Sequence, residues 1–177
     1  EGGGITIKNG TCFDRAKLLR YCGIGKSGFE ASTHGQKRWW EYRIVEPFIK
    51  MNPSDISAAI ALGQLENLDR NQGRRREIWD IYQAEFASED WITRPLEPPA
   101  EDQHSYFTYV VRVPKRDRFA KYLFDNGIYT TLRYHPLHMN PLYEQTDKEL
   151  PNSETLNEDA LSIPLHPNLT DADVGKV

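Results

Sequence analysis

The second half of the chain contains the segment that most constrains the fold, because its hydrophobic periodicity changes twice within a short stretch. Residues 104–113 (HSYFTYVVRV) are rich in β-branched and aromatic side chains, which is typical of a strand. Residues 115–126 have the spacing of a helix with one apolar face, and Gly127 stands where a glycine commonly ends a helix. Residues 128–134 again favour a strand. This strand–helix–strand unit predicts a two-layer α/β domain.

Two helices are predicted ahead of this unit. The first begins near Ser54, and residues 56–68 are apolar on nearly every side, so we expect this helix to be buried on several sides. The sequence Asn-Gln-Gly at 71–73 is expected to weaken or kink the helical run. Residues 74–86 then predict an amphipathic helix with apolar side chains one turn apart.

The N-terminal segment, residues 1–53, gives weaker signals. Residues 5–8 predict a strand, and residues 13–22 predict a helix that Thr11 caps and Gly23 ends. The stretch beyond Gly23 is too long for a connecting loop in a compact domain, and a loop of that length usually carries a function or contacts a partner.

The C-terminal segment continues the α/β unit. Residues 135–152 predict a proline-rich loop, and residues 153–161 predict a short helix. Thr170 is expected to cap a last helix that begins at Asp171.

Composition and charge exclude several classes of protein. The chain of 177 residues has no apolar run long enough to predict a membrane-spanning helix, and its net charge of −4 argues against general electrostatic binding of nucleic acid. Cys12 and Cys22 are too few for a disulfide scaffold or a four-cysteine zinc site, which favours reduced thiols in a cytoplasmic protein. The chain begins at Glu1 without a Met, and we expect a fragment of a longer protein rather than a processed terminus.

The candidate site lies directly after the second predicted strand. Arg133, Tyr134, His135 and His138 stand where α/β sheets place their ligand contacts. Pro136 prevents the helical geometry in which two histidines share a metal ion, so no metal site is expected. The histidines remain open to two interpretations, a functional loop or residues satisfied within the structure.

Two basic segments and the glycine-rich start bear on anion binding. The first segment is a loop that is equally compatible with a phosphate or nucleotide site and with a solvated surface over buried tryptophans; its residues are Lys37, Arg38, Trp39, Trp40, Arg43 and Lys50. The three arginines at 74–76 are interpreted as a solvated helix face, and the glycines at 2–4 give only a weak signal for an anion-binding turn.

Taken in order, these segments resemble the C-terminal half of the DegT/StrS-type sugar aminotransferases, which are fold-type I enzymes that use pyridoxal 5′-phosphate (PLP). The resemblance covers nearly the whole chain, and no single piece of it is specific. The matching pieces are Glu1 to Gly3 with the following GITIKNG, Met51 to Ile60 (MNPSDISAAI), Gln64-Leu65, Leu68-Asp69, the run at 74–78, residues 126–138, and Leu161 to Thr170 (LSIPLHPNLT).

The resemblance implies a domain organisation and a function. Residues 1–53 would end the large PLP domain and include an interface loop, residues 54–93 would be connecting helices, and residues 94–177 would form a truncated small α/β domain. The implied activity is transfer of an amino group, usually from glutamate or glutamine, to a nucleotide-linked keto-sugar in cell-envelope or secondary-metabolite sugar biosynthesis. The implied state is a cytoplasmic homodimer with neither nucleic acid nor a membrane as a partner.

The resemblance also implies roles for single residues. Arg133, Tyr134, His135 and His138 would contact the substrate. Lys50 and Asn52 would bind the cofactor, although Phe48 and Lys50 replace an asparagine and an arginine of the family's pattern.

The lysine that holds PLP would precede Glu1, so this chain is expected to contain no catalytic residue and to be inactive alone. Because that position is missing, a related PLP sugar dehydratase stays an alternative. A non-catalytic α/β module that binds a nucleotide is the other alternative.

Overall fold

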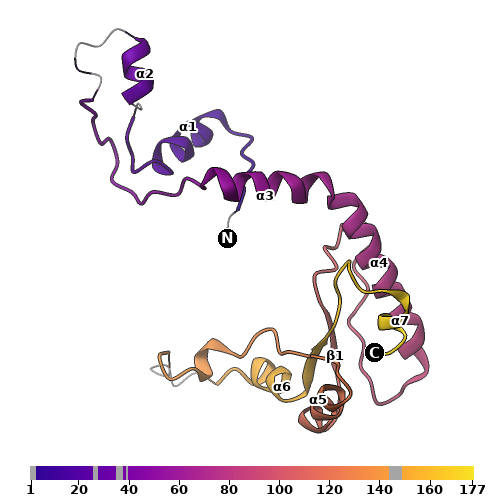
Figure 1. Cartoon of the computed structure of the whole chain (residues 1–177). Helices are drawn as coiled ribbons and strands as arrows, with labels where there is room; N and C mark the ends of the chain where they lie inside the picture. The colour runs from indigo at the N-terminus through magenta and orange to yellow at the C-terminus, as the bar shows by residue number, and fades with distance from the viewer. Residues whose placement is uncertain (1–2, 26–27, 35–37, 39, 144–148) are drawn as a thin grey trace. The chain divides into compact units, whose positions relative to one another are not determined.

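The structure, a computed structural model, describes residues 3–25, 28–34, 38, 40–143 and 149–177. It divides into two compact units, Glu1–Glu66 and Asn67–Val177 (Figure 1). This division falls inside the segment 54–93 that the sequence predicts as connecting helices. The three-part domain organisation itself stays a prediction.

The described part of the N-terminal unit contains three helices. They are α1 (Gly10–Leu19), α2 (Gly28–Thr33) and α3 (Asp55–Glu66). The side chain of Asn9, and not that of Thr11, caps α1 by accepting a hydrogen bond of 3.2 Å from the backbone N–H of Cys12. The strand predicted at residues 5–8 is wrong, because this segment pairs with no other strand in the described part of the chain.

A close backbone contact at Gly23 organises this unit. Helix α1 ends at Leu19, earlier than predicted, and Gly23 then adopts a left-handed φ of 71°. The Gly23 carbonyl accepts a hydrogen bond of 2.9 Å from the N–H of Val45. Arg15 on α1 forms an ion pair of 2.7 Å with Glu46 beside the same contact. The stretch before α3 is therefore held against the end of α1.

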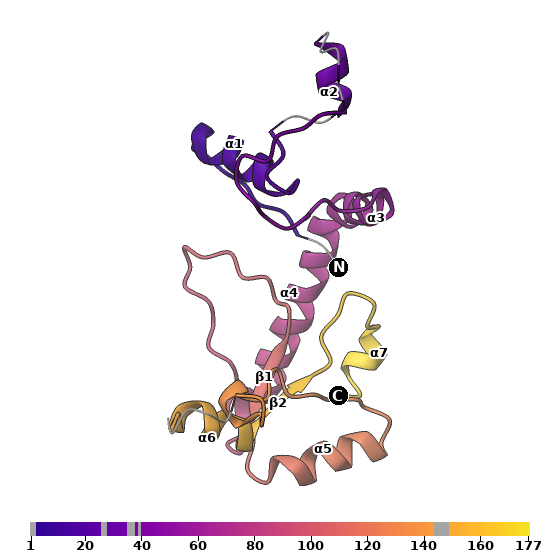
Figure 2. The ribbon, with the colours of Figure 1, turned by 90° about the vertical axis from the view of Figure 1, so that its left-hand side faces the viewer.

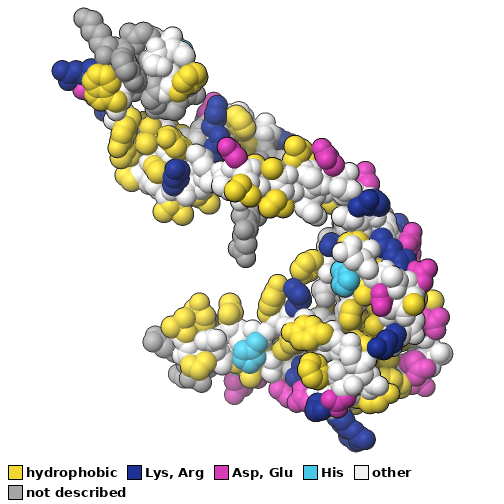
Figure 3. All heavy atoms as spheres, viewed as in Figure 1, with side chains coloured by type: hydrophobic (Ala, Val, Ile, Leu, Met, Phe, Trp, Pro, Cys, Tyr) yellow, Lys and Arg dark blue, Asp and Glu magenta, His cyan; other side chains and the backbone are white. Residues whose placement is uncertain are grey.

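Helix α3 presents its apolar side chains to the surface of its unit. None of its residues is buried within the chain, and Ile60 and Leu65 are 62% and 65% exposed. Figure 3 shows apolar side chains along this helix. The burial expected for this helix is therefore not provided by the described residues of the chain.

The C-terminal unit begins with the long helix α4 (Leu68–Glu85), followed by the 3-10 helix η1 (Phe86–Ser88). Residues 71–73, where the sequence predicts a weakened or kinked helix, do not interrupt it, because α4 runs through Gly73 and the interruption lies at Asn67. A glycine inside a helix costs about 1 kcal/mol relative to alanine. Burial of Ile78, Trp79 and Tyr82 on one face of α4 offsets that cost.

A small antiparallel sheet lies at the centre of this unit (Figure 2). Strand β1 (Tyr109–Arg112) pairs with β2 (Ala160–Ile163), with Tyr109 opposite Ile163. Thr93 adds one bridge to Arg112, and Thr131 adds one bridge to Ser162. The remaining elements are α5 (Arg116–Asp125), η2 (Leu137–Met139), α6 (Pro151–Asp159) and α7 (Asp171–Val174).

The α/β fold class is confirmed, but the predicted strand–helix–strand unit is not formed as expected. Residues 128–134 contribute only the bridge at Thr131, and the partner of β1 is β2, a strand that the sequence interpretation missed. The helix predicted over 153–161 ends at Asp159, where pairing with β1 takes over.

Two predicted helix ends are confirmed. Gly127 adopts a φ of 78° after α5, and the N–H of Ile128 reaches back 2.8 Å to the carbonyl of Leu123. Thr170 and Asp173 form a reciprocal capping box at the start of α7.

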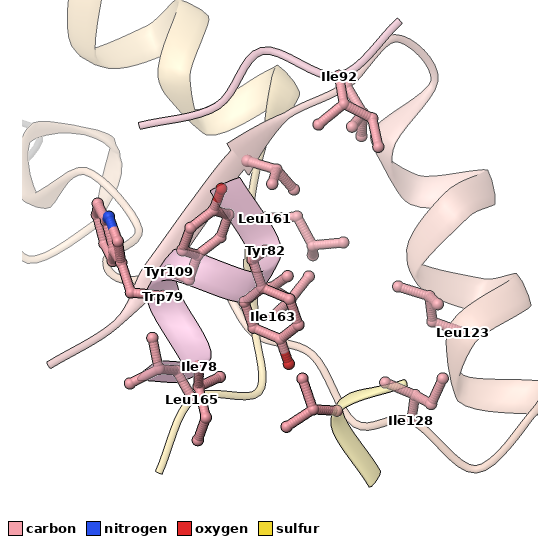
Figure 4. Close-up of a cluster of buried hydrophobic side chains, with 13 residues drawn as sticks. Ile78, Trp79, Tyr82, Ile92, Tyr109, Leu123, Ile128, Leu161, Ile163 and Leu165 are labelled. Atoms are coloured by element: carbon pink, nitrogen blue, oxygen red, sulfur yellow. The ribbon is translucent and has the colours of Figure 1, made fainter. Parts of the chain in front are cut away.

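The hydrophobic core joins α4, the sheet and α5 in two layers (Figure 4). The rings of Trp79 and Tyr82 on α4 contact Tyr109 on β1, with centroids 4.8 Å and 5.1 Å away. Burial raises the pKa of both Tyr82 and Tyr109 to about 12. The Tyr82 hydroxyl donates to the carbonyl of Pro164 over 2.9 Å, whereas the Tyr109 hydroxyl has no partner among the described residues.

Candidate functional site

The predicted site residues occupy the loop after Thr131, and they have different surroundings. Arg133 is exposed and lies with its guanidinium 5.3 Å from the centroid of the Phe107 ring, within the range of a cation–π interaction. Tyr134 is 77% exposed. The two neighbouring side chains are therefore free to meet a ligand from solvent.

The two histidines connect this loop to α6. His135 shares a hydrogen bond of 3.0 Å with Asn157, and His138 lies 3.0 Å from a carboxylate oxygen of Glu154. Glu154 also accepts the backbone N–H of Leu150, and this bond, followed by that to His138, lowers the pKa of its carboxyl. These contacts position both imidazoles, and their role toward a ligand stays a prediction.

A hollow of about 530 Å³ lies in the C-terminal unit, and Arg133 is the one predicted site residue that lines it. Arg75 on α4 and Ser162 on β2 also line it, although the sequence interpretation singled out neither as a site residue. The sequence predicts a solvated helix face for Arg75 and its two neighbours, whereas the Nε–H of Arg75 is buried. Ser162 carried one available signal, since it is the single polar residue of the otherwise apolar sequence Ala-Leu-Ser-Ile.

The predicted cofactor residues lie in the N-terminal unit. Asn52 lines a second hollow, of about 480 Å³, together with Lys17 and Arg20. Lys50 is exposed, is not among the residues that line this hollow, and forms an antiparallel backbone bridge with Tyr21. Two basic side chains, Lys17 and Arg20, and one acidic side chain, Asp14, line this hollow, and Lys50 does not.

The tryptophan-containing basic loop is described only in part. Lys37 and Trp39 lie outside the described residues, as do Glu1 and Gly2 of the glycine-rich start. Arg38 forms an ion pair of 2.8 Å with Glu41.

Within the described ranges, no helix is long and apolar enough to cross a membrane.

The comparisons with known proteins identify the family. The model of the DegT/DnrJ/EryC1/StrS aminotransferase family matches residues 1–177, so the chain belongs to this family. A curated relative, the dTDP-4-dehydro-2,3,6-trideoxy-D-glucose 4-aminotransferase of Saccharopolyspora spinosa, is 35% identical over 182 residues, which cover 100% of this chain and 46% of the relative.

Solved structures agree with this assignment. The aminotransferase TlmJ from Streptoalloteichus hindustanus matches with a TM-score of 0.81 and 33% identity over 97% of this chain and 44% of its own. The putative sugar aminotransferase Spr1654 from Streptococcus pneumoniae, in its PMP form, matches with a TM-score of 0.80 and 26% identity over 98% of this chain and 44% of its own. The fold is that of part of a fold-type I aminotransferase, and the chain spans less than half the length of these relatives.

Proposed function

We propose that this chain serves in PLP-dependent transfer of an amino group, from glutamate or glutamine, to a nucleotide-linked keto-sugar. The observation that carries the proposal is the 35% identity, along the full length of the chain, to a relative named as an aminotransferase of a dTDP-linked dehydro-sugar. Because the neighbours are named as aminotransferases, amino transfer is favoured over dehydration and over nucleotide binding without catalysis.

The cofactor is part of the proposal. Aminotransferases of this family are PLP-dependent, and Spr1654 is known in PLP and PMP forms. PLP, when bound, supplies the carbonyl that accepts an amino group, and it requires a lysine held at its carbonyl carbon. The described lysines do not fit that anchoring role, because all of them are exposed: Lys8, Lys17, Lys50, Lys115, Lys121 and Lys176. Lys50 and Asn52 are proposed only as contacts to the cofactor.

The residues of the loop after Thr131 are proposed to bind the substrate. The planar guanidinium of Arg133 is suited to phosphate oxygens, and the exposed hydroxyl of Tyr134 is suited to a sugar hydroxyl. His135 and His138 each hold a polar partner on α6, which would fix their rings for a ligand hydrogen bond through the other ring nitrogen.

An assay of the complete gene product with PLP, glutamate and dTDP-4-dehydro-2,3,6-trideoxy-D-glucose tests the proposed function. We expect equal amounts of the amino sugar and 2-oxoglutarate, because each amino group transferred leaves one keto acid. Mass spectrometry of the sugar product and an enzymatic measurement of 2-oxoglutarate check this balance. Loss of water without gain of nitrogen, or no turnover with any of a panel of nucleotide-linked keto-sugars, would contradict the proposal.

A homodimer that uses the apolar surface of α3 is also proposed. Exposed apolar patches of several hundred Å² commonly mark interfaces, and four such side chains are exposed on this helix: Ile56, Ile60, Leu62 and Leu65.

A cytoplasmic location is also proposed, because Cys12 and Cys22 are free and disulfides are rare in the reducing cytoplasm.

Sedimentation velocity at micromolar concentration tests the association. Burying an isoleucine side chain contributes about 1.5–3 kcal/mol, so Ile60→Glu should weaken self-association by at least about tenfold. Tyr122→Glu on α5 is the matched control, since Tyr122 is similarly exposed in the other unit. A monomer at all concentrations, or equal effects of the two substitutions, would count against the α3 interface.

A further inference from the structure

Three consecutive arginines on α4 have three different environments. Arg74 forms ion pairs with Glu77 and Asp171 and donates to the carbonyl of Leu169. Arg76 lies 3.8 Å from Asp80 on the surface of the same helix. Arg75 has no ion-pair partner among the described residues, and its Nε–H is buried without an acceptor.

A second buried donor lies in the same hollow. Ser162 is 4% exposed, and its hydroxyl has no hydrogen-bond partner in the described part of the chain. Arg75 and Ser162 both line the hollow of about 530 Å³. Buried donors without an acceptor cost free energy, and native structures usually satisfy them with protein, water or a ligand.

The charge of the lining favours an anion. Arg133, Lys176 and His166 line the hollow with Arg75, and Asp173 is the acidic side chain of the lining. The carboxylate of Asp173 is already engaged, because one of its oxygens accepts the backbone N–H and the hydroxyl of Thr170 in the capping box. The hydrogen bonds with Thr170 are the largest cause of a lowered pKa of the Asp173 carboxyl. The nearby His166 and Lys176 lower this pKa further. Neither Arg75 nor Arg133 forms an ion pair with a carboxylate among the described residues.

We infer that this hollow binds a small oxyanion, a phosphate or a carboxylate group, with Arg75 and Ser162 as its buried donors and Arg133 at its rim. A guanidinium has a donor fork that matches two oxygens of such a group, and the serine hydroxyl adds one neutral donor. The inference goes beyond the proposed function through Arg75 and Ser162, which are not among the proposed substrate or cofactor contacts, whereas Arg133 is shared with the proposed substrate site. It holds or fails whether or not the chain serves in amino transfer.

Titration of the 177-residue chain with inorganic phosphate, followed by NMR at the Arg75 Nε–H and the Ser162 amide, tests the site. We expect saturable shifts beyond those caused by sodium chloride at matched ionic strength. Arg75→Gln should weaken phosphate binding by roughly tenfold or more, and Ser162→Ala by about two- to tenfold, as expected for charged and neutral hydrogen bonds. Arg76→Gln is the matched control and should leave the dissociation constant unchanged.

A parallel titration with acetate distinguishes the two sources of the oxyanion. Saturation by phosphate alone identifies a phosphate-bearing ligand, and saturation by both identifies a general oxyanion site. Shifts that only follow ionic strength would overturn the inference, as would equal losses in Arg75→Gln and Arg76→Gln. Should Arg75→Gln not fold, an unchanged dissociation constant in Ser162→Ala would overturn the role of the buried donors.

Discussion

Replacement of Tyr109 by alanine is expected to lower the free energy of unfolding of the C-terminal unit by about 3–5 kcal/mol, as for other large aromatic side chains removed from a core. Tyr109 is 0% exposed and contacts the rings of Trp79, Tyr82 and Phe86, so its loss leaves a cavity where α4 meets the sheet. Urea unfolding followed by tryptophan fluorescence measures the change, because Trp79 lies in the same cluster.

Two phenylalanine substitutions separate packing from hydrogen bonding. Tyr109→Phe should change stability by less than about 1 kcal/mol, because the hydroxyl it removes has no partner among the described residues. Tyr82→Phe should cost about 1–3 kcal/mol, because it leaves the carbonyl of Pro164 without this donor. If Tyr109→Phe were as damaging as Tyr109→Ala, the packing of this ring would not be the source of the stability.

Gly23→Ala is expected to cost the N-terminal unit about 2–3 kcal/mol, the sum of left-handed strain and one lost backbone hydrogen bond. A Cβ at this position would lie 1.7 Å from the carbonyl oxygen of Glu46, so the backbone must separate and release the bond from Val45 to Gly23. Gly23 is also the one buried residue in the described part of this unit. Hydrogen exchange at the Val45 amide should therefore approach that of an unfolded chain.

The matched control for this substitution is Gly127→Ala. Gly127 also has a left-handed φ, of 78°. A Cβ atom added there would have the Lys176 ammonium as its nearest neighbour, at 3.7 Å, which is an ordinary van der Waals contact. Only the conformational strain of about 1–2 kcal/mol is expected there. Equal costs at both glycines would show that the contact with Glu46 is not what restricts Gly23.

The local sequence was sufficient at two helix ends but not at the start of α1, where Asn9 takes the capping role predicted for Thr11. Gly127 and Thr170 were predicted as helix ends from their residue types alone, and both adopt those roles. The family was also predictable, because the order and spacing of several weak motifs along the chain matched it, and the family model covers all of them.

Pairing between distant segments was not predictable in the same way. Residues 128–134 have good strand composition but form only one bridge, while residues 160–163 pair with β1 across a long sequence separation. Strand composition describes a fit to a half-buried pleated surface, and which segment occupies that surface depends on neighbours far away in sequence. Helix α4 continues through residues 71–73 for a similar reason, because its core contacts outweigh a local glycine.

The amino-acid sequence by itself determined the helix ends at Gly127 and Thr170, the α/β class and the family of this chain. Tertiary structure alone decided which of three identical neighbours, Arg74, Arg75 and Arg76, would be paired, enclosed or solvated. The physical reason is that residue type fixes what a side chain can donate or accept, whereas burial and partners are fixed by segments that meet only when the chain folds.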